Sequence, residues 1–336
     1  MSFVIQLQQQ IKRLWGSKEP DSTEPATKII RESGTYVSLQ HLIGLQRHTR
    51  MLDLSRRISS ARQGAHASRF RGRGMDYQES RVYQAGDDVR SMDWRVTARA
   101  GRPHVKVFEE ERERPVVLLV DYSASLFFGS VNAFKSVIAT EVAAMLAWTT
   151  INKSDRIGAL LINDSHKELP PKMGKRAVLR LLHELLNFSD PNKAQQDSAS
   201  HLNEELQRLR RIARPGSMVF LISDFYQIDD ETQRHLTRLK QHCDVVAIQI
   251  VDPLEETPPP AGRYYVSNGD EEAILDTYSA RNQKKYQHYF QQHHQRLQKL
   301  MSQQQIILLK VSTADDVALT LQGYFSKKPT PQKVSA

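Results

Sequence analysis

The sequence predicts an α/β fold with a doubly wound, mostly parallel sheet. Two observations support this prediction. Four apolar runs rich in Val, Leu and Ile lack polar alternation, which is typical of strands buried on both faces. Segments with apolar residues at helical spacing separate these runs, as expected for a parallel sheet covered by helices on both sides. The four runs are Val116–Val120, Ile157–Ile162, Met218–Ile222 and Val245–Val251.

The composition of the 336-residue chain is that of an ordinary globular protein, with 39% hydrophobic and 25% charged residues. A chain of this length has room for about two domains and a sizeable core. Disorder throughout, a collagen-like fibre and a disulfide scaffold are excluded. Cys243 is the only cysteine, so an internal disulfide and a cysteine-based metal site are also excluded, and a reducing compartment fits.

The charge of the chain is uneven. Residues 1–115 hold 21 Lys and Arg against 14 Asp and Glu, which places +7 of the net charge of +9 in the first third. This excess predicts an acidic partner surface, whether protein, lipid headgroup or nucleic acid. No apolar run approaches the roughly 20 residues that span a bilayer, and residues 1–18 lack a secretory pattern, so we expect a cytoplasmic protein.

The linkers divide the chain into segments. Residues 1–36 form a polar extension, whose first 15 residues either fray or make a weak membrane-surface contact through Phe3, Ile5 and their apolar neighbours. We expect residues 37–115 and 263–325 to form a smaller unit beside the sheet, unless the sheet itself extends. The expected segments are 1–36, a basic region 37–115, the sheet domain 116–251, a C-terminal α/β extension 263–325, and a loose tail 326–336.

Oxygen-bearing side chains follow the ends of two predicted strands. Asp121, Ser123 and Ser125 come directly after the first strand, and Asp224 follows the third. The loop before Leu202 adds Ser198 and Ser200. In an open α/β sheet, ligands bind at the carboxyl ends of strands, and such hard oxygen donors suit Mg²⁺ or Mn²⁺. The alternative is that these residues only cap helices and form turns.

This pattern resembles the metal-ion-dependent adhesion site of von Willebrand factor A domains. The run from Gly72 to Arg99, GRGMDYQESRVYQAGDDVRSMDWRVTAR, resembles the signature of the bacterial DUF58 family, in which it precedes a von Willebrand A-like domain. The resemblance covers residues 37–325. It implies that Ser123 and Ser125 are direct metal ligands and that Asp121 and Asp224 act largely through bound water. The family's threonine is missing; Ser200 is the best substitute and Ser198 the second.

Charged residues alternate densely in the run that carries the DUF58 resemblance. Surface ion pairs stabilise little, so this pattern indicates a structured interface more than a stable core. A salt-bridged domain junction and a partner-binding surface are both open. The candidate partner-binding residues are Arg81, Tyr83, Asp87, Asp88, Arg90, Asp93, Trp94 and Arg99.

The resemblance implies a non-enzymatic adaptor whose Mg²⁺ binds a partner carboxylate, and which works with a MoxR-type AAA+ ATPase on a client protein. One alternative is nucleic-acid binding through the basic N-terminal third, although nucleic acid is not the expected partner. The other is a metal-dependent hydrolase with Asp121 as nucleophile, for which Tyr122–Ser125 supplies neither a second acid nor a lysine. We expect His288, His293 and His294 to be solvated on a helix.

Overall fold

The computed structural model describes residues 33–50, 52–54, 75–110, 114–193, 202–267 and 272–325. The chain divides into two compact units, residues 62–113 and the rest of the chain. The predictions for Ser198, Ser200 and the two chain ends concern residues outside the described ranges. Within the described part, no helix is both long and apolar enough to cross a membrane.

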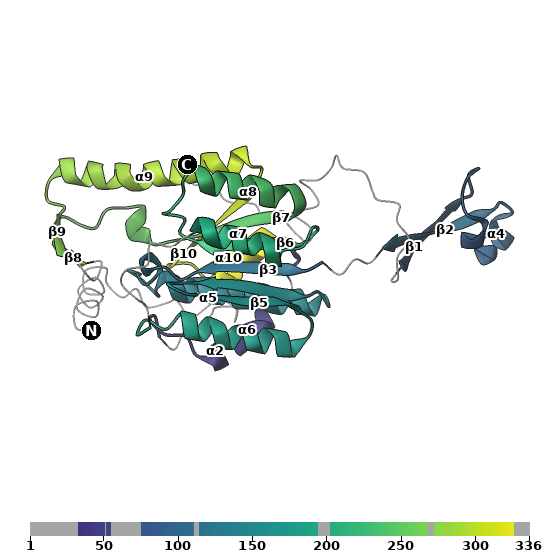
Figure 1. Cartoon of the computed structure of the whole chain (residues 1–336), viewed down its shortest axis with the longest axis horizontal. Coiled ribbons are helices and arrows are strands. Elements are labelled where there is room, and N and C mark those ends of the chain that lie inside the picture. The colour runs from purple at the N-terminus through teal and green to yellow at the C-terminus, as the bar shows by residue number, and fades with distance from the viewer. Residues whose placement is uncertain are drawn as a thin grey trace, which may run out of the picture. The chain divides into compact units, whose positions relative to one another are not determined.

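The larger unit is built on a six-stranded sheet of strand order β10-β7-β6-β3-β4-β5 (Figure 1). Every neighbouring pair is parallel except the β4–β5 hairpin, which confirms the predicted fold class. All residues of β3, β4, β6 and β7 are buried, as their unbroken apolar sequences predict. The strands are β3 (Val116–Asp121), β4 (Ile157–Ile162), β5 (His166–Lys172), β6 (Met218–Ser223), β7 (Asp244–Val251) and β10 (Ile307–Ser312).

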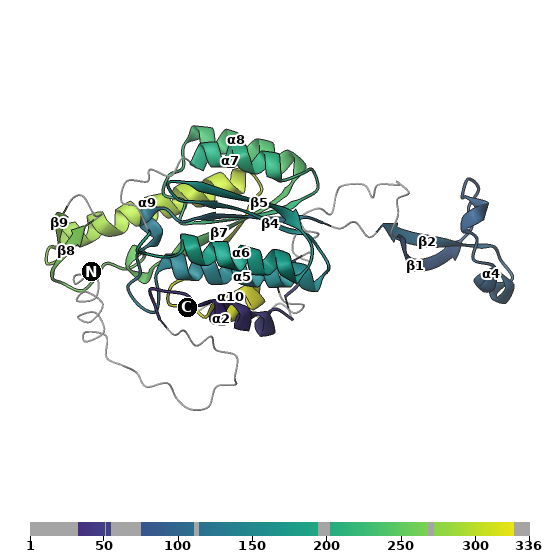
Figure 2. The same cartoon turned by 60° about the horizontal axis from the view of Figure 1, so that its bottom comes forward.

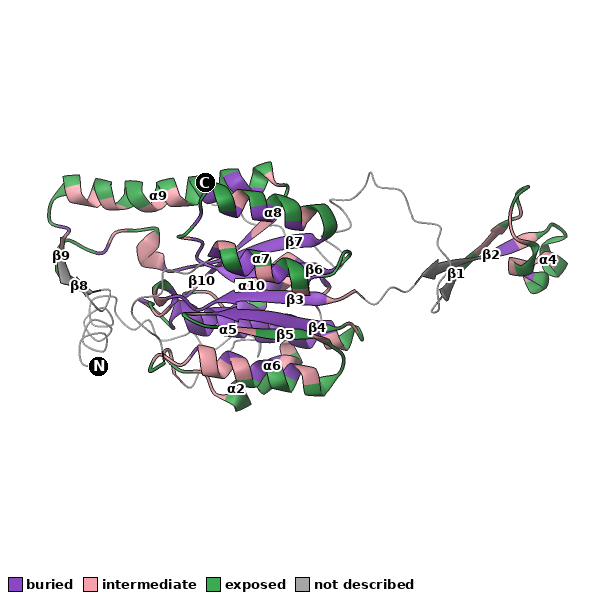
Figure 3. Cartoon of the chain, viewed as in Figure 1, coloured by how far each residue is buried: buried purple, intermediate pink, exposed green. Residues whose placement is uncertain are grey.

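Helices cover both faces of this sheet (Figure 2). Alternate residues of β3 point into two separate cores: Leu118 packs with α5, α6 and α10, whereas Leu119 packs with α7, α8 and α9. Helix α5 is buried on nearly all sides (Figure 3). The helices are α2 (Leu39–Gly44), α5 (Lys135–Asn152), α6 (Lys175–Phe188), α7 (Leu202–Ile212), α8 (Asp230–His242), α9 (Ala280–Gln303) and α10 (Val317–Phe325), with short 3₁₀ turns η1 (Leu45–Thr49), η3 (Ala124–Leu126) and η4 (Pro253–Glu255).

The chain outside residues 116–251 is divided differently from the expected smaller unit. Strand β10 pairs with β7, so the C-terminal extension enlarges the sheet, which is the arrangement left open as the alternative. Leu42 and Leu45 pack in the same core as α5, so residues near 40 also belong to the larger unit. The hairpin of β8 (Arg263–Ser267) and β9 (Glu272–Asp276) completes it. The apolar residues of β10 and of the segment near residue 40 require burial, and the core beside the main sheet provides it.

The smaller unit comprises a β-hairpin with two short helical segments on it. Strand β1 (Met75–Val82) pairs with β2 (His104–Glu110) in antiparallel register. Between them lie η2 (Val89–Ser91) and α4 (Trp94–Ala100). A turn after β1 includes Gly86, whose φ of 107° lies in the region that favours glycine.

Candidate metal and carboxylate centre

The parallel register of β3 and β6 brings the two predicted aspartates to one sheet edge. Val120 pairs with Ile222, so Asp121 lies level with Ser223, the residue directly before Asp224. Both aspartates are almost completely buried, with 3% and 2% of their surface exposed. Burial and the charge of Asp224 raise the pKa of Asp121 to about 6. The edge therefore carries two carboxylates whose charges are costly to bury together.

The serine hydroxyls of the motif lie beside these carboxylates and do not act as helix caps. Ser123 directly precedes η3 at the N-cap position, yet its side chain makes no capping hydrogen bond. Its hydroxyl lies 3.2 Å from that of Ser125. Asp121 Oδ1 accepts the N–H of Ser123, and Oδ2 accepts the hydroxyl of Ser223. The structure thus brings Asp121, Ser123, Ser125 and Asp224 together, while Ser200 lies outside the described residues.

This donor set fits a hard divalent cation. Adjacent oxygen ligands of an octahedral Mg²⁺ are about 3 Å apart, close to the separation of the two serine hydroxyls. Two buried aspartates supply the negative charge. Within the described residues, no group of three or more His, Cys, Asp or Glu is placed to hold a metal ion. A cation here would therefore rely on the serine hydroxyls as well as on the aspartates.

A buried lysine also reaches this centre. The Nζ atom of Lys135, at the start of α5, lies 2.9 Å from Oδ2 of Asp224 and 2.6 Å from Oε1 of Glu255. Burial alone would lower the pKa of Lys135, but the two carboxylates outweigh it and raise the pKa to about 12. Tyr122–Ser125 supplies neither a second acid nor a lysine, as the sequence shows, whereas Lys135 and Glu255 join the centre through Asp224 from elements distant in sequence.

Helix α9 covers the loop that follows Asp224. The imidazole of His293 stacks on the ring of Tyr226, with centroids 4.3 Å apart and planes 17° apart, and its Nε2 lies 3.1 Å from the carbonyl oxygen of Asp224. Lys135 Nζ lies 5.3 Å from the centroid of the same tyrosine ring. The prediction that His293 is simply solvated is therefore wrong, because stacking on Tyr226 half-buries it. Burial lowers its pKa.

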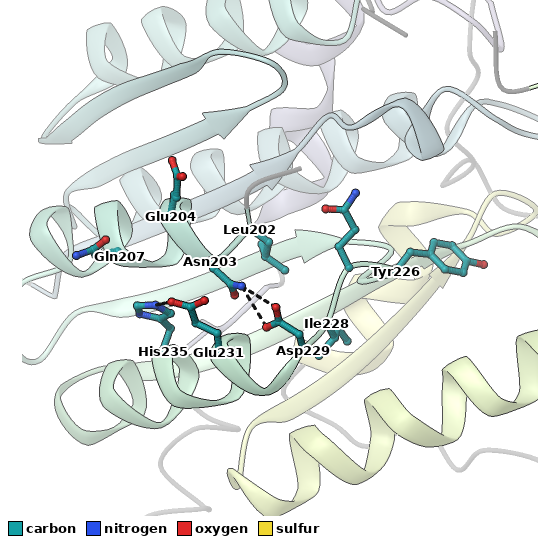
Figure 4. Close-up of a pocket in the computed structure, with 10 residues that line it drawn as sticks. Leu202, Asn203, Glu204, Gln207, Tyr226, Ile228, Asp229, Glu231 and His235 are labelled. Atoms are coloured by element: carbon teal, nitrogen blue, oxygen red, sulfur yellow. Dashed lines mark hydrogen bonds and ion pairs between the residues drawn. The ribbon is translucent and has the colours of Figure 1, made fainter. Parts of the chain in front are cut away.

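A polar cleft of about 480 Å³ opens between α7 and α8 (Figure 4). Asn203 donates to both carboxylate oxygens of Asp229, which caps α8. Tyr226 also lines the cleft, so the cleft reaches the loop after Asp224. No sequence motif indicates this cleft, because its walls come from two helices and a loop that are separate in the sequence.

Comparison with known proteins places the chain in a family. The family model described as "Protein of unknown function DUF58" matches residues 79–297. A Mycobacterium tuberculosis relative, "Uncharacterized protein Rv1480", is 30% identical over 226 residues, which is 67% of this chain and 70% of the relative. The chain belongs to the DUF58 family. The matched region begins within β1 and contains β2 and the strands β3 to β7 of the main sheet.

Solved structures similar to this DUF58 protein are more distant. BatB from Bacteroides thetaiotaomicron is 12% identical, with a TM-score of 0.41, over 62% of this chain and 95% of that chain. A von Willebrand factor type A protein from Catenulispora acidiphila is 12% identical, with a TM-score of 0.31, over 44% of this chain and 34% of that chain.

In the DUF58 signature, the acidic candidate residues stabilise the local fold of the smaller unit. Asp87 pairs with Arg81 at 2.6 Å and accepts the N–H of Gln84. Asp88 caps η2. Asp93 caps α4 and also accepts the hydroxyl of Ser80. These carboxylates are therefore engaged within their own unit.

The remaining candidates of the signature leave an exposed surface. Trp94 is 68% exposed, so within the described residues it is no packing anchor. Arg90 and Arg99 are exposed, and no described acidic side chain pairs with either guanidinium. Tyr83 is half-buried, and its N–H donates to the carbonyl of Pro103. The exposed part of the signature is thus basic and aromatic, whereas its acidic part is structural.

Several residues of the centre were missed by sequence reasoning. Glu255 and Tyr226 had no signal, because nothing in a sequence tells which loops meet over a sheet. Lys135 had a weak sequence signal. It begins a helix that has no polar face, so its ammonium group is buried with the helix and needs a buried acidic partner. Ser223 precedes Asp224 directly and could have been included with it.

Proposed function

We propose that this DUF58 protein is a non-enzymatic adaptor that binds a carboxylate of a partner protein through a divalent cation held at the end of β3 and β6. The observation that carries the proposal is the meeting of the Ser123 and Ser125 hydroxyls with the buried Asp121 and Asp224. When bound, Mg²⁺ or Mn²⁺ would supply a Lewis-acidic coordination position for the partner's oxygen. The chain's own residues supply the hydroxyl ligands and the compensating charge.

The environment of Asp121 favours this adaptor role over the hydrolase alternative. Both of its carboxylate oxygens already accept hydrogen bonds, from Ser123 N–H and from the Ser223 hydroxyl. A nucleophile needs an unobstructed approach to its substrate, and Asp121 is 3% exposed. The geometry of Asp121 suits a carboxylate that interacts with the cation through a bound water molecule.

The partner in this proposal is a MoxR-type AAA+ ATPase in the cytoplasm, with a client protein that the pair assembles or activates. The family resemblance supports this partnership. The exposed basic and aromatic surface around Trp94 and Arg99 supports a second contact with an acidic protein surface. In this proposal the ATPase contacts both surfaces of the chain, and the pair then acts on the client.

Isothermal titration of Mg²⁺ and Mn²⁺ into the metal-free protein tests the proposal. We expect saturable binding that Asp121→Ala abolishes, while Asp164→Ala, the same change at an exposed turn, leaves it intact. Circular dichroism checks that each variant folds. A pull-down with the MoxR-type ATPase of the same organism, with Mg²⁺ or with EDTA, then tests the bridge. Absence of metal binding in the wild-type protein would remove the cation from the function.

A further inference from the structure

A lysine ammonium group is built into the carboxylate centre. Lys135 is 1% exposed and contacts one oxygen of Asp224. Its second partner, Glu255, is held in place because its Oε2 accepts the N–H of Asp252 in a capping box. The ammonium group is therefore positioned by two elements, α5 and η4, and is no chance contact of a surface side chain.

We infer that Lys135 sets the affinity of this centre for divalent cations by competing with the metal for Asp224, an inference that rests on the proposed function. The centre holds three carboxylates, those of Asp121, Asp224 and Glu255, and one ammonium group, which contacts Asp224 and Glu255. Together these groups leave two net negative charges. That is the charge a single divalent cation neutralises. The ammonium group occupies Oδ2 of Asp224, so a metal must share this carboxylate with a neighbouring positive charge.

Glu255 has the opposite effect on the metal. Its carboxylate lies 2.6 Å from Lys135 Nζ and offsets much of the positive charge that the metal would meet. Removing the lysine charge should therefore strengthen metal binding, and removing the glutamate charge should weaken it. A purely structural role for the pair predicts something else, namely that both substitutions damage the centre and weaken binding.

The test is isothermal titration of Mg²⁺ and of Mn²⁺ into four proteins: wild type, Lys135→Met, Glu255→Gln and the double variant. We expect Lys135→Met to bind about tenfold more tightly than wild type and Glu255→Gln to bind several-fold more weakly. Lys153→Met is the matched control, since Lys153 follows the other end of α5 and pairs with Asp53. Its metal affinity should equal that of wild type.

Folding is checked by circular dichroism and by thermal melting with and without Mg²⁺. Lys135→Met leaves the buried Asp224 and the half-buried Glu255 without their ammonium partner. If this single variant unfolds, the double variant, which keeps the net charge of wild type, is measured in its place. It should bind Mg²⁺ more tightly than wild type. Equal or weaker binding by every folded variant lacking Lys135, or shifts of the same sign for Lys135→Met and Glu255→Gln, would overturn the inference.

The outcomes separate this inference from the proposed function. If wild type binds metal and removal of Lys135 does not tighten it, the adaptor proposal stands and the inference fails. If wild type binds no metal and Lys135→Met or the double variant binds metal, the inference holds and the metal bridge fails. The Lys135 ammonium group then takes the place of a metal ion in the wild-type protein. If no variant binds metal, both are overturned.

Discussion

The hydroxyl of Ser223 donates a 2.7 Å hydrogen bond to Oδ2 of Asp121, joining the carboxyl ends of β6 and β3. The same Ser223 oxygen accepts the N–H of Phe225 at 2.9 Å. Phe225 has a φ of 58°, in the left-handed region that a bulky residue rarely adopts. One hydroxyl therefore supports both a buried carboxylate and the unusual turn that orients the loop after Asp224.

Replacing Ser223 with alanine is expected to lower the free energy of unfolding by about 1–3 kcal/mol, because Asp121 loses a buried donor. Ser217→Ala is the matched control. Ser217 is fully buried just before β6, and within the described part of the chain its hydroxyl has no hydrogen-bond partner. Its removal should change stability by less than about 0.5 kcal/mol. Urea unfolding measures both, and equal losses would contradict the assigned role of Ser223.

Asp252 forms a second buried carboxylate site, which should matter for stability. Its side chain is fully buried and accepts hydrogen bonds from the N–H of Ser130, from the hydroxyl of Thr313 at 2.6 Å and from the N–H of Leu254. It therefore ties the loop before α5 to the ends of β7 and β10.

Asp252→Asn places an amide NH₂ group, which can only donate, against donors that the carboxylate now accepts. We therefore expect a loss of about 2–4 kcal/mol in the free energy of unfolding. Asp164→Asn, at an exposed turn, should cost less than about 0.5 kcal/mol. Chemical denaturation measures both. A near-neutral Asp252→Asn would show that the carboxylate is not the acceptor for these donors.

The pKa of Asp93 predicts how the smaller unit responds to acid. The hydroxyl of Ser80 and the N–H of Val96 hold the pKa of this carboxyl below its usual value of 3.8. Because the folded-state pKa is lowered, the stabilisation is fully present above pH 3.8 and is lost as the pH falls through the folded value. An NMR titration of the Asp93 carboxyl carbon should show a midpoint below 3.8, and Ser80→Ala should raise it. An unchanged midpoint in Ser80→Ala would refute this cause.

The exposed basic and aromatic surface of the smaller unit should affect partner binding and not folding. We expect Trp94→Ala combined with Arg99→Ala to reduce binding to the MoxR-type ATPase about tenfold or more, with a change in the melting temperature of less than about 2 °C. Leu319→Ala, at an exposed apolar residue of α10, is the control. Binding of the wild-type protein to duplex DNA with a steep salt dependence would favour the nucleic-acid alternative instead.

The sequence by itself determined the fold class and one half of the centre. The buried strands β3, β4, β6 and β7 could be predicted because a strand covered on both faces must be apolar throughout. The positions of Asp121, Ser123, Ser125 and Asp224 followed, since the carboxyl ends of parallel strands meet at one edge of a sheet. These are local consequences of a chain that has to bury its apolar runs.

Only the tertiary structure decided which charges meet at that edge. Lys135 lies 89 residues from Asp224 and 120 residues from Glu255 along the chain, and no spacing rule connects such positions. The same holds for His293, which α9 brings onto Tyr226, and for the exposure of Trp94. Side-chain partners depend on how helices and loops pack over the sheet, and that packing is a property of the whole fold, because burying one charge requires another to come from elsewhere.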